Sequence, residues 1–179
     1  MKLFAGSASE ELALKVARIL GINLSSSEIT RFANSEVKVR IKENVKNEVC
    51  VVIQSTSNPT DTNLMELFFF CDALKRQEAE KVVAVIPYFG YARQNISHLP
   101  GESVSANVVI RFLETVGFSK VYTFDLHDEA TEGVFSIPFK NLTALPLLAL
   151  ALKKDYKSHL ANIAIVSPDQ GGIERVRRF

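Results

Sequence analysis

The chain has 179 residues, of which 47% are hydrophobic and 23% charged, and its 21 Lys and Arg residues against 20 Asp and Glu residues give a net charge of +1. This length is typical of one domain, or of one domain with the start of another, and it is enough to bury a substantial core. The near-neutral charge argues against a protein whose main partner is a nucleic-acid backbone or an anionic membrane, because both favour a basic excess. Phosphate ligands are not excluded.

The apolar segments are too short for targeting or membrane insertion. The N-terminal segment MKLFAGSASEELALK reaches acidic and polar residues before an apolar stretch forms, so we expect no signal peptide. The runs FFFC and LPLLALAL are too short to span a bilayer. Cys50 and Cys71 lie in apolar surroundings without C-x-x-C spacing, which indicates buried reduced thiols in a cytoplasmic protein.

Short runs rich in Val and Ile alternate with longer segments of helical period. Taken in chain order, the pattern predicts a helix over 9–20, a strand over 49–54, a helix over 61–76, a strand over 81–87, a helix over 103–116, a strand over 120–124, a helix over 145–154 and a strand over 162–166. Each strand is almost continuously apolar, as strands covered on both faces are. The alternation predicts an α/β protein with a largely parallel sheet.

One segment differs from this alternation. Within residues 28–43, the run VKVRI alternates apolar and basic residues with period two. That period suits a half-exposed antiparallel strand or flap.

A polar loop follows each of the four predicted strands. The loops are QSTSNP, YFGYARQ, DLHD and SPDQGG. In open parallel sheets, ligands bind outside the carboxyl ends of the strands. We therefore expect the functional residues in these loops.

The turn FANSEVKVR places an aromatic ring and polar side chains just before the half-exposed strand; these are Phe32, Asn34, Ser35 and Glu36. In a functional interpretation, the ring stacks on a base while Asn34 and Glu36 hydrogen-bond the edge of a nucleobase or a ribose. In the plainer interpretation, the segment is a β-turn whose Phe fills the core. From residue types alone we favour the β-turn.

In PYFGYARQ, Gly90 permits a sharp bend after the strand, and Arg93 and Gln94 follow it. The planar guanidinium group of Arg93 suits polyphosphate oxygens. The alternative is a surface Arg whose stem lies over Tyr88 and Tyr91. Both interpretations stay open at this point.

DLHDE places Asp125, His127, Asp128 and Glu129 at the end of a strand. Such donors suit Mg²⁺ or a phosphate, although Mg²⁺ usually takes few protein ligands and keeps several waters. A strand-end His beside helix-capping carboxylates is the alternative, and we favour the functional interpretation. SPDQGG places Asp169 and a Gly pair before a helix, where backbone amides can approach a phosphate.

Five segments resemble, in order and spacing, the ribose-phosphate diphosphokinases, also called phosphoribosyl pyrophosphate synthetases. They are FANSEVKVRI, VVIQSTSNPTDTNLMELFFFCDALKR, AVIPYFGYARQ, YTFDLHD and IVSPDQGGIERVRRF. The resemblance implies a phosphoribosyltransferase-like domain over 1–142, with a mainly parallel sheet flanked by helices and a short antiparallel flap. It also implies that 143–179 is the truncated beginning of a second, similar domain.

The resemblance implies an enzyme that transfers the β,γ-diphosphoryl group of ATP to the 1-hydroxyl of ribose 5-phosphate, giving phosphoribosyl pyrophosphate and AMP. This chemistry needs positioning and charge neutralisation more than covalent catalysis. By resemblance, the adenosine would be held by Phe32, Asn34, Ser35 and Glu36. Arg93 and Gln94 would contact the ATP phosphates and base. His127 would lie at the position of the Mg²⁺ and polyphosphate, and Asp169 at a second metal position near the ribose. The family typically delivers its adenine loop from a neighbouring subunit, which implies a homo-oligomer.

The chain departs from the family pattern in three places. Ser35 replaces a usual Gly, residues 95–98 (Asn, Ile, Ser and His) replace an Asp and basic residues, and Gly6-Ser7-Ala8-Ser9 stands for a G-N-x-x-P-type turn. The chain also stops before the family's flexible loop with its catalytic Lys and Arg, and before the acidic phosphoribosyl-binding loop. No catalytic residue is therefore assigned, and we expect the chain alone not to complete the reaction.

Three functions fit these observations to different degrees. The first is the N-terminal part of an active synthetase. The second is a non-catalytic regulatory or assembly subunit related to the synthetase, for which the altered residues are the motivation. The third, a small stand-alone phosphoribosyltransferase-like protein, conflicts with the lack of a DD run followed by T-G-T.

Overall fold

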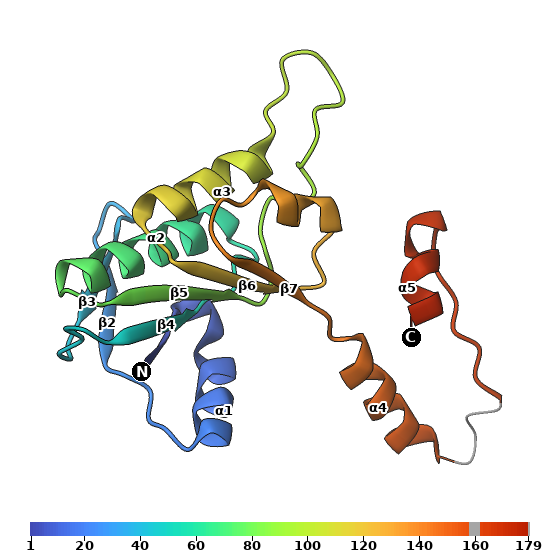
Figure 1. Cartoon of the computed structure of the whole chain (residues 1–179), viewed down its shortest axis with the longest axis horizontal. Helices are drawn as coiled ribbons and strands as arrows, with labels where there is room; N and C mark the ends of the chain where they lie inside the picture. The colour runs from blue at the N-terminus through green and yellow to red at the C-terminus, as the bar shows by residue number, and fades with distance from the viewer. Residues whose placement is uncertain (158–161, 179) are drawn as a thin grey trace. The chain divides into compact units, whose positions relative to one another are not determined.

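The computed structural model describes residues 1–157 and 162–178, and the chain divides into two compact units, Met1–Leu142 and Thr143–Phe179. The first unit is an α/β domain (Figure 1). Its main sheet has the order β1-β4-β5-β6-β7 and is parallel throughout. The strands are β1 (Lys2–Ala5), β4 (Val49–Ile53), β5 (Lys81–Ile86), β6 (Lys120–Phe124) and β7 (Phe139–Leu142).

The sequence analysis identified the three central strands but missed both edge strands. The helices of this unit also match their predicted segments within two residues at each end; they are α1 (Glu10–Leu20), α2 (Thr60–Arg76) and α3 (Ser105–Val116), with short 3₁₀ turns η1 (Ser7–Ser9) and η2 (Glu129–Val134). Glycines in the left-handed conformation end α1 and α3: Gly21 has φ 66° and Gly117 has φ 105°. Their amides donate to the last carbonyls of each helix, so both helices stop at a residue without a Cβ penalty.

Helices cover both faces of the sheet, α1 on one and α2 and α3 on the other (Figure 1). Neighbouring residues of β1 show the alternation, because Leu3 packs in the cluster with α1 whereas Phe4 packs in the larger cluster with α2. The larger core includes the fully buried Leu67 and Phe70 of α2. This two-sided cover explains why the central strands are apolar along their whole length.

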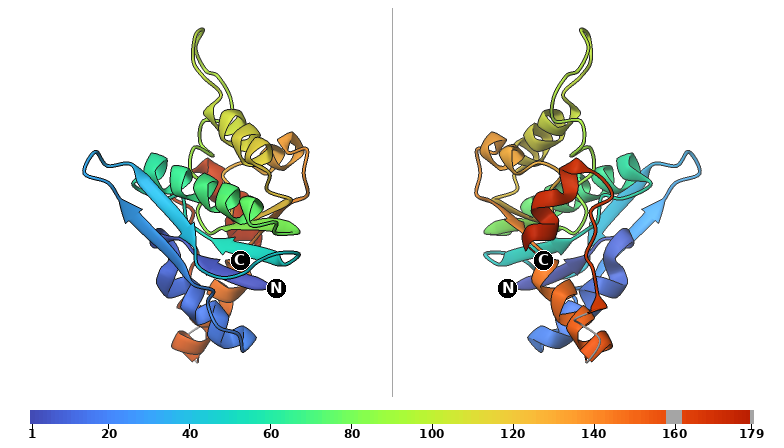
Figure 2. Two further views of the ribbon diagram at one scale, coloured as in Figure 1. Left: turned by 90° about the vertical axis from the view of Figure 1, so that its left-hand side faces the viewer. Right: turned by 90° about the vertical axis from the view of Figure 1, so that its right-hand side faces the viewer.

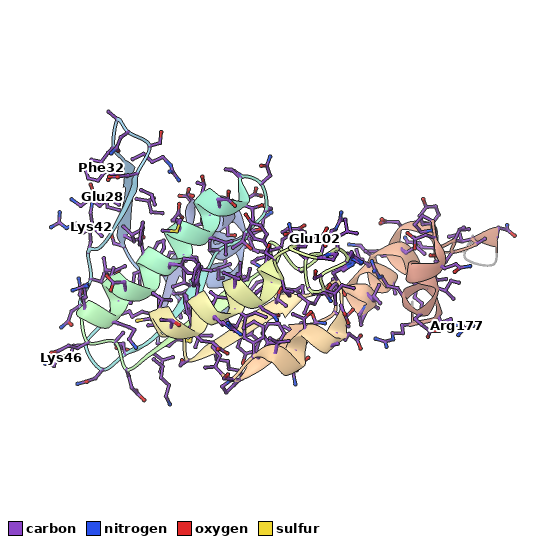
Figure 3. All side chains as sticks on the ribbon, turned by 90° about the horizontal axis from the view of Figure 1, so that it is seen from above. Glu28, Phe32, Lys42, Lys46, Glu102 and Arg177 are labelled. Carbon is purple, nitrogen blue, oxygen red and sulfur yellow. The ribbon has the colours of Figure 1, made fainter. Side chains whose placement is uncertain are left out.

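A two-stranded antiparallel hairpin, β2 (Ser27–Arg31) with β3 (Val37–Ile41), forms the predicted flap. Its inward side chains Ile29 and Val39 pack against the larger core. Its outer face carries the cross-strand ion pair of Glu28 with Lys42, at 2.9 Å (Figure 3). The turn end of the hairpin projects away from the sheet (Figure 2).

The second unit contains α4 (Leu145–Tyr156), the 3₁₀ turn η4 (Gln170–Gly172) and α5 (Ile173–Arg178). The prediction of a strand over 162–166 is wrong. Residues 163–167 have no regular structure, and Val166 is 79% exposed. A strand is stabilised by a ladder with a neighbour, and no described residue pairs with this run.

Three further observations concern the expectations from composition. Both cysteines are buried free thiols, as predicted. Burial raises the pKa of Cys50 to about 11 and that of Cys71 to about 12, so both stay protonated at neutral pH. Among the described residues, no helix combines the length and apolar character needed to cross a membrane.

Candidate functional site

The hairpin turn presents the candidate adenosine-binding residues to solvent. Phe32 is 54% exposed near the end of the hairpin, so the interpretation of this ring as a core residue is wrong (Figure 3). The turn is closed by backbone bonds from the Phe32 amide to the Glu36 carbonyl and from the Ser35 amide to the Phe32 carbonyl, both 2.9 Å. The Asn34 side chain accepts from the Glu36 amide at 3.3 Å, which leaves its NH₂ group for another partner.

Ser35 shows how the chain keeps this turn without a glycine. Its φ is 73°, the left-handed region that glycine adopts without strain. The Arg31 guanidinium donates to the Ser35 carbonyl at 3.0 Å and braces the turn. The departure from the family pattern therefore changes the residue but not the backbone conformation that a glycine would take.

A hollow of about 510 Å³ lies between the hairpin and α2. Its hairpin wall includes Phe32, Ser35 and Glu36, and its α2 wall includes Asp61, Thr62, Met65 and Phe69. Apolar walls with a few polar groups are typical of small-molecule sites. The hollow offers a ring for stacking and a carboxylate for hydrogen bonding.

The loop after β5 forms a second hollow, of about 500 Å³. It is lined by Arg93 and Gln94 together with Tyr88, Tyr91 and the start of α2, including Asp61 and Thr62. Asp61 and Thr62 therefore line both hollows, which makes the two hollows neighbours. The candidate adenosine residues and the candidate phosphate residues thus lie along one surface of the first unit.

Tyr91 fixes the beginning of this loop. It has a positive φ of 64°, and its hydroxyl donates a short hydrogen bond to the Asp61 carboxylate. That hydrogen bond raises the pKa of Tyr91, because the phenol must keep its proton to donate. A non-glycine residue in this conformation is held there by its surroundings, here by Asp61.

Arg93 is exposed and free to bind. Within residues 1–157 and 162–178, its guanidinium makes no hydrogen bond, ion pair or cation–π contact, whereas the alternative of an Arg stem lying over Tyr88 and Tyr91 stays a prediction. Gln94 is anchored to the start of α3, since its side-chain oxygen accepts from the Ser105 hydroxyl at 2.7 Å. Its NH₂ group remains available to a ligand.

In the loop after β6, Asp128 and His127 differ in their contacts. Asp128 caps η2 by accepting from the Ala130 amide at 2.9 Å, as the structural alternative predicted. Its other oxygen accepts from the Asn95 side chain at 2.6 Å. His127 is exposed and makes no contact of these kinds with any residue that the structure describes. It lines neither hollow.

The donor set around His127 suits a cation only in part. No group of three or more His, Cys, Asp or Glu side chains that could hold a metal occurs within the described residues. Both Asp128 oxygens already accept hydrogen bonds, whereas His127 makes none with the residues that the structure describes. A Mg²⁺ ion bound mainly by substrate phosphates and waters needs few protein ligands, and these residues fit that arrangement.

Asp169, in the second unit, acts as a cap. Its carboxylate accepts from the Gly172 amide at 3.0 Å, and the side chain is exposed. The glycine pair forms the second and third residues of η4, directly before α5. Because this carboxylate keeps a second oxygen, the predicted metal role stays a prediction.

The sequence analysis missed a buried polar network under the same edge of the sheet. Glu66 of α2 is 0% exposed and accepts from the Ser7 amide at 2.7 Å, the Ser7 hydroxyl at 2.6 Å and the Gln54 side chain at 2.9 Å. Gln54 accepts in turn from the Ala8 amide at 3.1 Å. The network ties the loop after β1 to the loop after β4.

Asp61 and Thr62 were missed as well. The available signal was their position, because they form the first turn of the helix that follows the polar loop after β4. The rule that ligands bind at the carboxyl ends of strands extends to the first turn of the next helix.

Comparison with known proteins gives one consistent relationship. A family model described as the N-terminal domain of ribose phosphate pyrophosphokinase matches residues 1–117. A ribose-phosphate pyrophosphokinase of Thermosipho africanus is 43% identical over 179 residues, covering 100% of this chain and 56% of its own length. One of Mesorhizobium japonicum is 45% identical over 177 residues, covering 99% and 57%.

A solved structure agrees with these relatives. The crystal structure of phosphoribosylpyrophosphate synthetase from Mycobacterium smegmatis matches with a TM-score of 0.92 and 34% identity, covering 99% of this chain and 59% of that one. The chain therefore spans little more than half the length of the proteins it matches.

Proposed function

The chain belongs to the ribose-phosphate pyrophosphokinase family, and on this basis we propose that it is the ATP-binding N-terminal part of an enzyme that transfers the diphosphoryl group of ATP to the 1-hydroxyl of ribose 5-phosphate. The products are phosphoribosyl pyrophosphate and AMP. Residues 1–142 would be the phosphoribosyltransferase-like domain on the ATP side, and 143–179 the beginning of a second such domain. By itself the chain is expected to bind ATP without turnover.

The observation that carries the proposal is the pair of adjoining hollows. One offers the exposed Phe32 ring and the Glu36 carboxylate, and the other offers the exposed Arg93 guanidinium. An aromatic ring suits a base, whereas a planar guanidinium suits phosphate oxygens. The two chemistries together match a nucleoside polyphosphate.

A Mg²⁺ ion would be held by the ATP phosphates, with His127 as the donor in this unit and Asp169 as a second metal position. Bound there, it would neutralise charge on the transferring phosphates. Arg93 would share that charge, while Gln94 would orient the base and phosphates. A homo-oligomer that shares the hairpin turn between subunits, and a cytoplasmic location, are further parts of the proposal.

Titration of the purified chain with MgATP by isothermal calorimetry tests the binding part. We expect measurable binding that Arg93→Ala weakens about tenfold or more, because charge-assisted hydrogen bonds to phosphate are lost. Arg93 pairs with no other residue in the part of the chain that the structure describes, so the free energy of unfolding should not change. Arg111→Ala, an exposed Arg of α3, is the matched control and should bind like the wild type.

Absence of MgATP binding by the wild-type chain, or equal effects of the two Arg variants, would contradict the proposal. Turnover is measured separately as AMP formed from ATP and ribose 5-phosphate. Robust AMP production by the chain would contradict its assignment as the ATP-binding part alone. If the chain bound no ATP but changed the rate of a full-length synthetase, the regulatory-subunit alternative would replace the proposal.

A further inference from the structure

A side-chain hydrogen bond joins the loop after β5 to the loop after β6. The Asn95 NH₂ group donates to the Asp128 carboxylate at 2.6 Å, in a half-buried setting and across 33 positions of the sequence. Asn95 follows Arg93 and Gln94 directly, and Asp128 follows His127. The bond therefore links the two groups of candidate phosphate-binding residues.

Asp128 is the rigid partner of this pair. One carboxylate oxygen caps η2 through the Ala130 amide, and the Asp128 carbonyl accepts from the Thr131 amide at 3.2 Å. Thr131 is itself buried, so η2 is fixed to the body of the domain. The second carboxylate oxygen faces Asn95, and an ionised acceptor makes a stronger bond than a neutral one.

The loop that carries Arg93 has several anchors. Besides the Asn95 bond, the Ala106 amide and the Ser105 hydroxyl of α3 donate to the Gln94 carbonyl at 3.1 Å and to its side-chain oxygen at 2.7 Å. Tyr91 holds its beginning through Asp61, but the chain then leads into an exposed segment before α3. Ile96 and Leu99 in that segment are 56% and 64% exposed. Asn95 is thus the last half-buried residue before the chain leaves the body of the domain.

We propose that Asn95 and Asp128 act as a clamp that positions Arg93 and Gln94 relative to His127 for binding the polyphosphate of ATP. The identity of the ligand rests on the proposed function, whereas the effect of the clamp on the conformational order of the two loops does not depend on any ligand. Neither residue is a catalytic residue. Both act through the backbone of the loops that they join.

The test is a charge exchange across the pair. Asn95→Asp places two carboxylates face to face, so the bond is lost and the loops repel each other. In the double variant Asn95→Asp with Asp128→Asn, the new Asn can still cap η2 through its oxygen and can donate its NH₂ group to the new carboxylate. The matched control combines Asn95→Asp with Asp155→Asn, which has the same net charge but leaves the pair broken; Asp155 is exposed in α4.

Two readouts separate the clamp from its ligand. Amide hydrogen exchange of the free chain, followed by mass spectrometry, reports the order of both loops. We expect Asn95→Asp to speed exchange in residues 91–95 and 127–131 about tenfold, with no change in the hairpin turn, and the charge-exchanged double variant to restore it. The affinity for MgATP should fall in Asn95→Asp and recover in the charge-exchanged double variant. The control double variant should keep both the faster exchange and the lower affinity.

Asn95→Ala removes the donor without adding a charge and should show a smaller increase in exchange, which keeps the test valid if Asn95→Asp folds poorly. Equal exchange in the two double variants overturns the clamp, whether or not the chain binds ATP. Exchange that follows the expected order with unchanged MgATP affinity overturns the positioning role. If exchange follows that order while the wild type binds no MgATP, the clamp stands as a link between the loops and the proposed function fails.

Discussion

Two sides of helix α2 differ in burial and in hydrogen bonding. Glu66 is fully buried and satisfied by three donors from the loop after β1 and from Gln54. Its neighbour Met65 is 44% exposed and faces the hollow under the hairpin, together with Asp61. One helix thus supports the fold with one side and lines the candidate site with the other.

The difference separates structural polar groups from ligand-binding ones. The Glu66 carboxylate is completely buried and therefore out of reach of a substrate, and removing it takes away the acceptor of three donors. The Phe32 ring and the Arg93 guanidinium are exposed and therefore accessible to a ligand. Substitutions on the Glu66 side should therefore change stability, and those around the hollows should change binding.

The largest effect is expected from Glu66→Ala. The substitution removes the acceptor of the fully buried Gln54 NH₂ group, and also that of the amide and hydroxyl of Ser7, which is an exposed residue. We expect the free energy of unfolding to fall by about 3–5 kcal/mol, because one buried donor loses its partner, two further hydrogen bonds to the carboxylate are lost, and the fully buried side chain leaves a cavity. Urea unfolding followed by circular dichroism measures the loss.

Glu80→Ala is the control for this experiment. Glu80 is exposed just before β5, and its ion pair with Lys81 is long, at 3.6 Å. It should change the free energy of unfolding by less than about 0.5 kcal/mol. Similar losses for the two Ala variants would show that the Glu66 network contributes little to stability.

A smaller loss is expected from Gly6→Ala, which disturbs the same network from the loop after β1. An added Cβ would lie 2.3 Å from the Gln54 Oε1 atom and 2.9 Å from the Gln54 Cβ atom. Gln54 is fully buried and cannot move aside without breaking its bonds to Glu66 and Ala8, so we expect a loss of about 1–3 kcal/mol in the free energy of unfolding. Gly133→Ala, where an added Cβ meets no atom within 4 Å, is the control in the same urea experiment.

If Gly6→Ala were as stable as Gly133→Ala, the packing of Gln54 against the loop after β1 would not be a constraint. The network would then tolerate changes on its backbone side. Of the buried network beside α2, only Glu66 would then be expected to affect the free energy of unfolding.

Local patterns predicted the elements of the fold wherever packing is two-sided. The central strands and the three helices of the first unit followed from apolar runs and helical period, because burial on both faces leaves a clear pattern. The edge strands β1 and β7 are four residues each, too short to show a period, and β7 has two polar residues, FKNL. The run over 162–166 has the composition of a strand but pairs with no neighbouring strand among the described residues. Composition alone does not show whether a neighbouring strand is present.

The candidate site was predictable where it lies in loops after strands. The family resemblance named Phe32, Glu36, Arg93 and Gln94, and these residues line the adjoining hollows, while their binding of a ligand stays a prediction. Glu66 was not identified, because it lies within an apolar helical segment and its Ser7 partner is 59 positions away. Whether such a residue is buried and satisfied depends on long-range packing, which no local pattern encodes.

The smallest effect concerns the exposed side, at Ser35. Its φ of 73° strains a side chain but not a glycine, and its backbone bonds to Phe32 and Arg31 involve only main-chain groups of residue 35. Ser35→Gly should therefore raise the free energy of unfolding by about 0.5 kcal/mol, after the greater freedom of glycine in the unfolded chain is offset. Ser26→Gly, at a position outside the left-handed region, should lower it instead. Thermal unfolding of the two variants measures both effects. Equal destabilisation would mean that Ser35 is not strained, whereas effects of opposite sign would show that the Ser35 side chain lowers the stability of the turn.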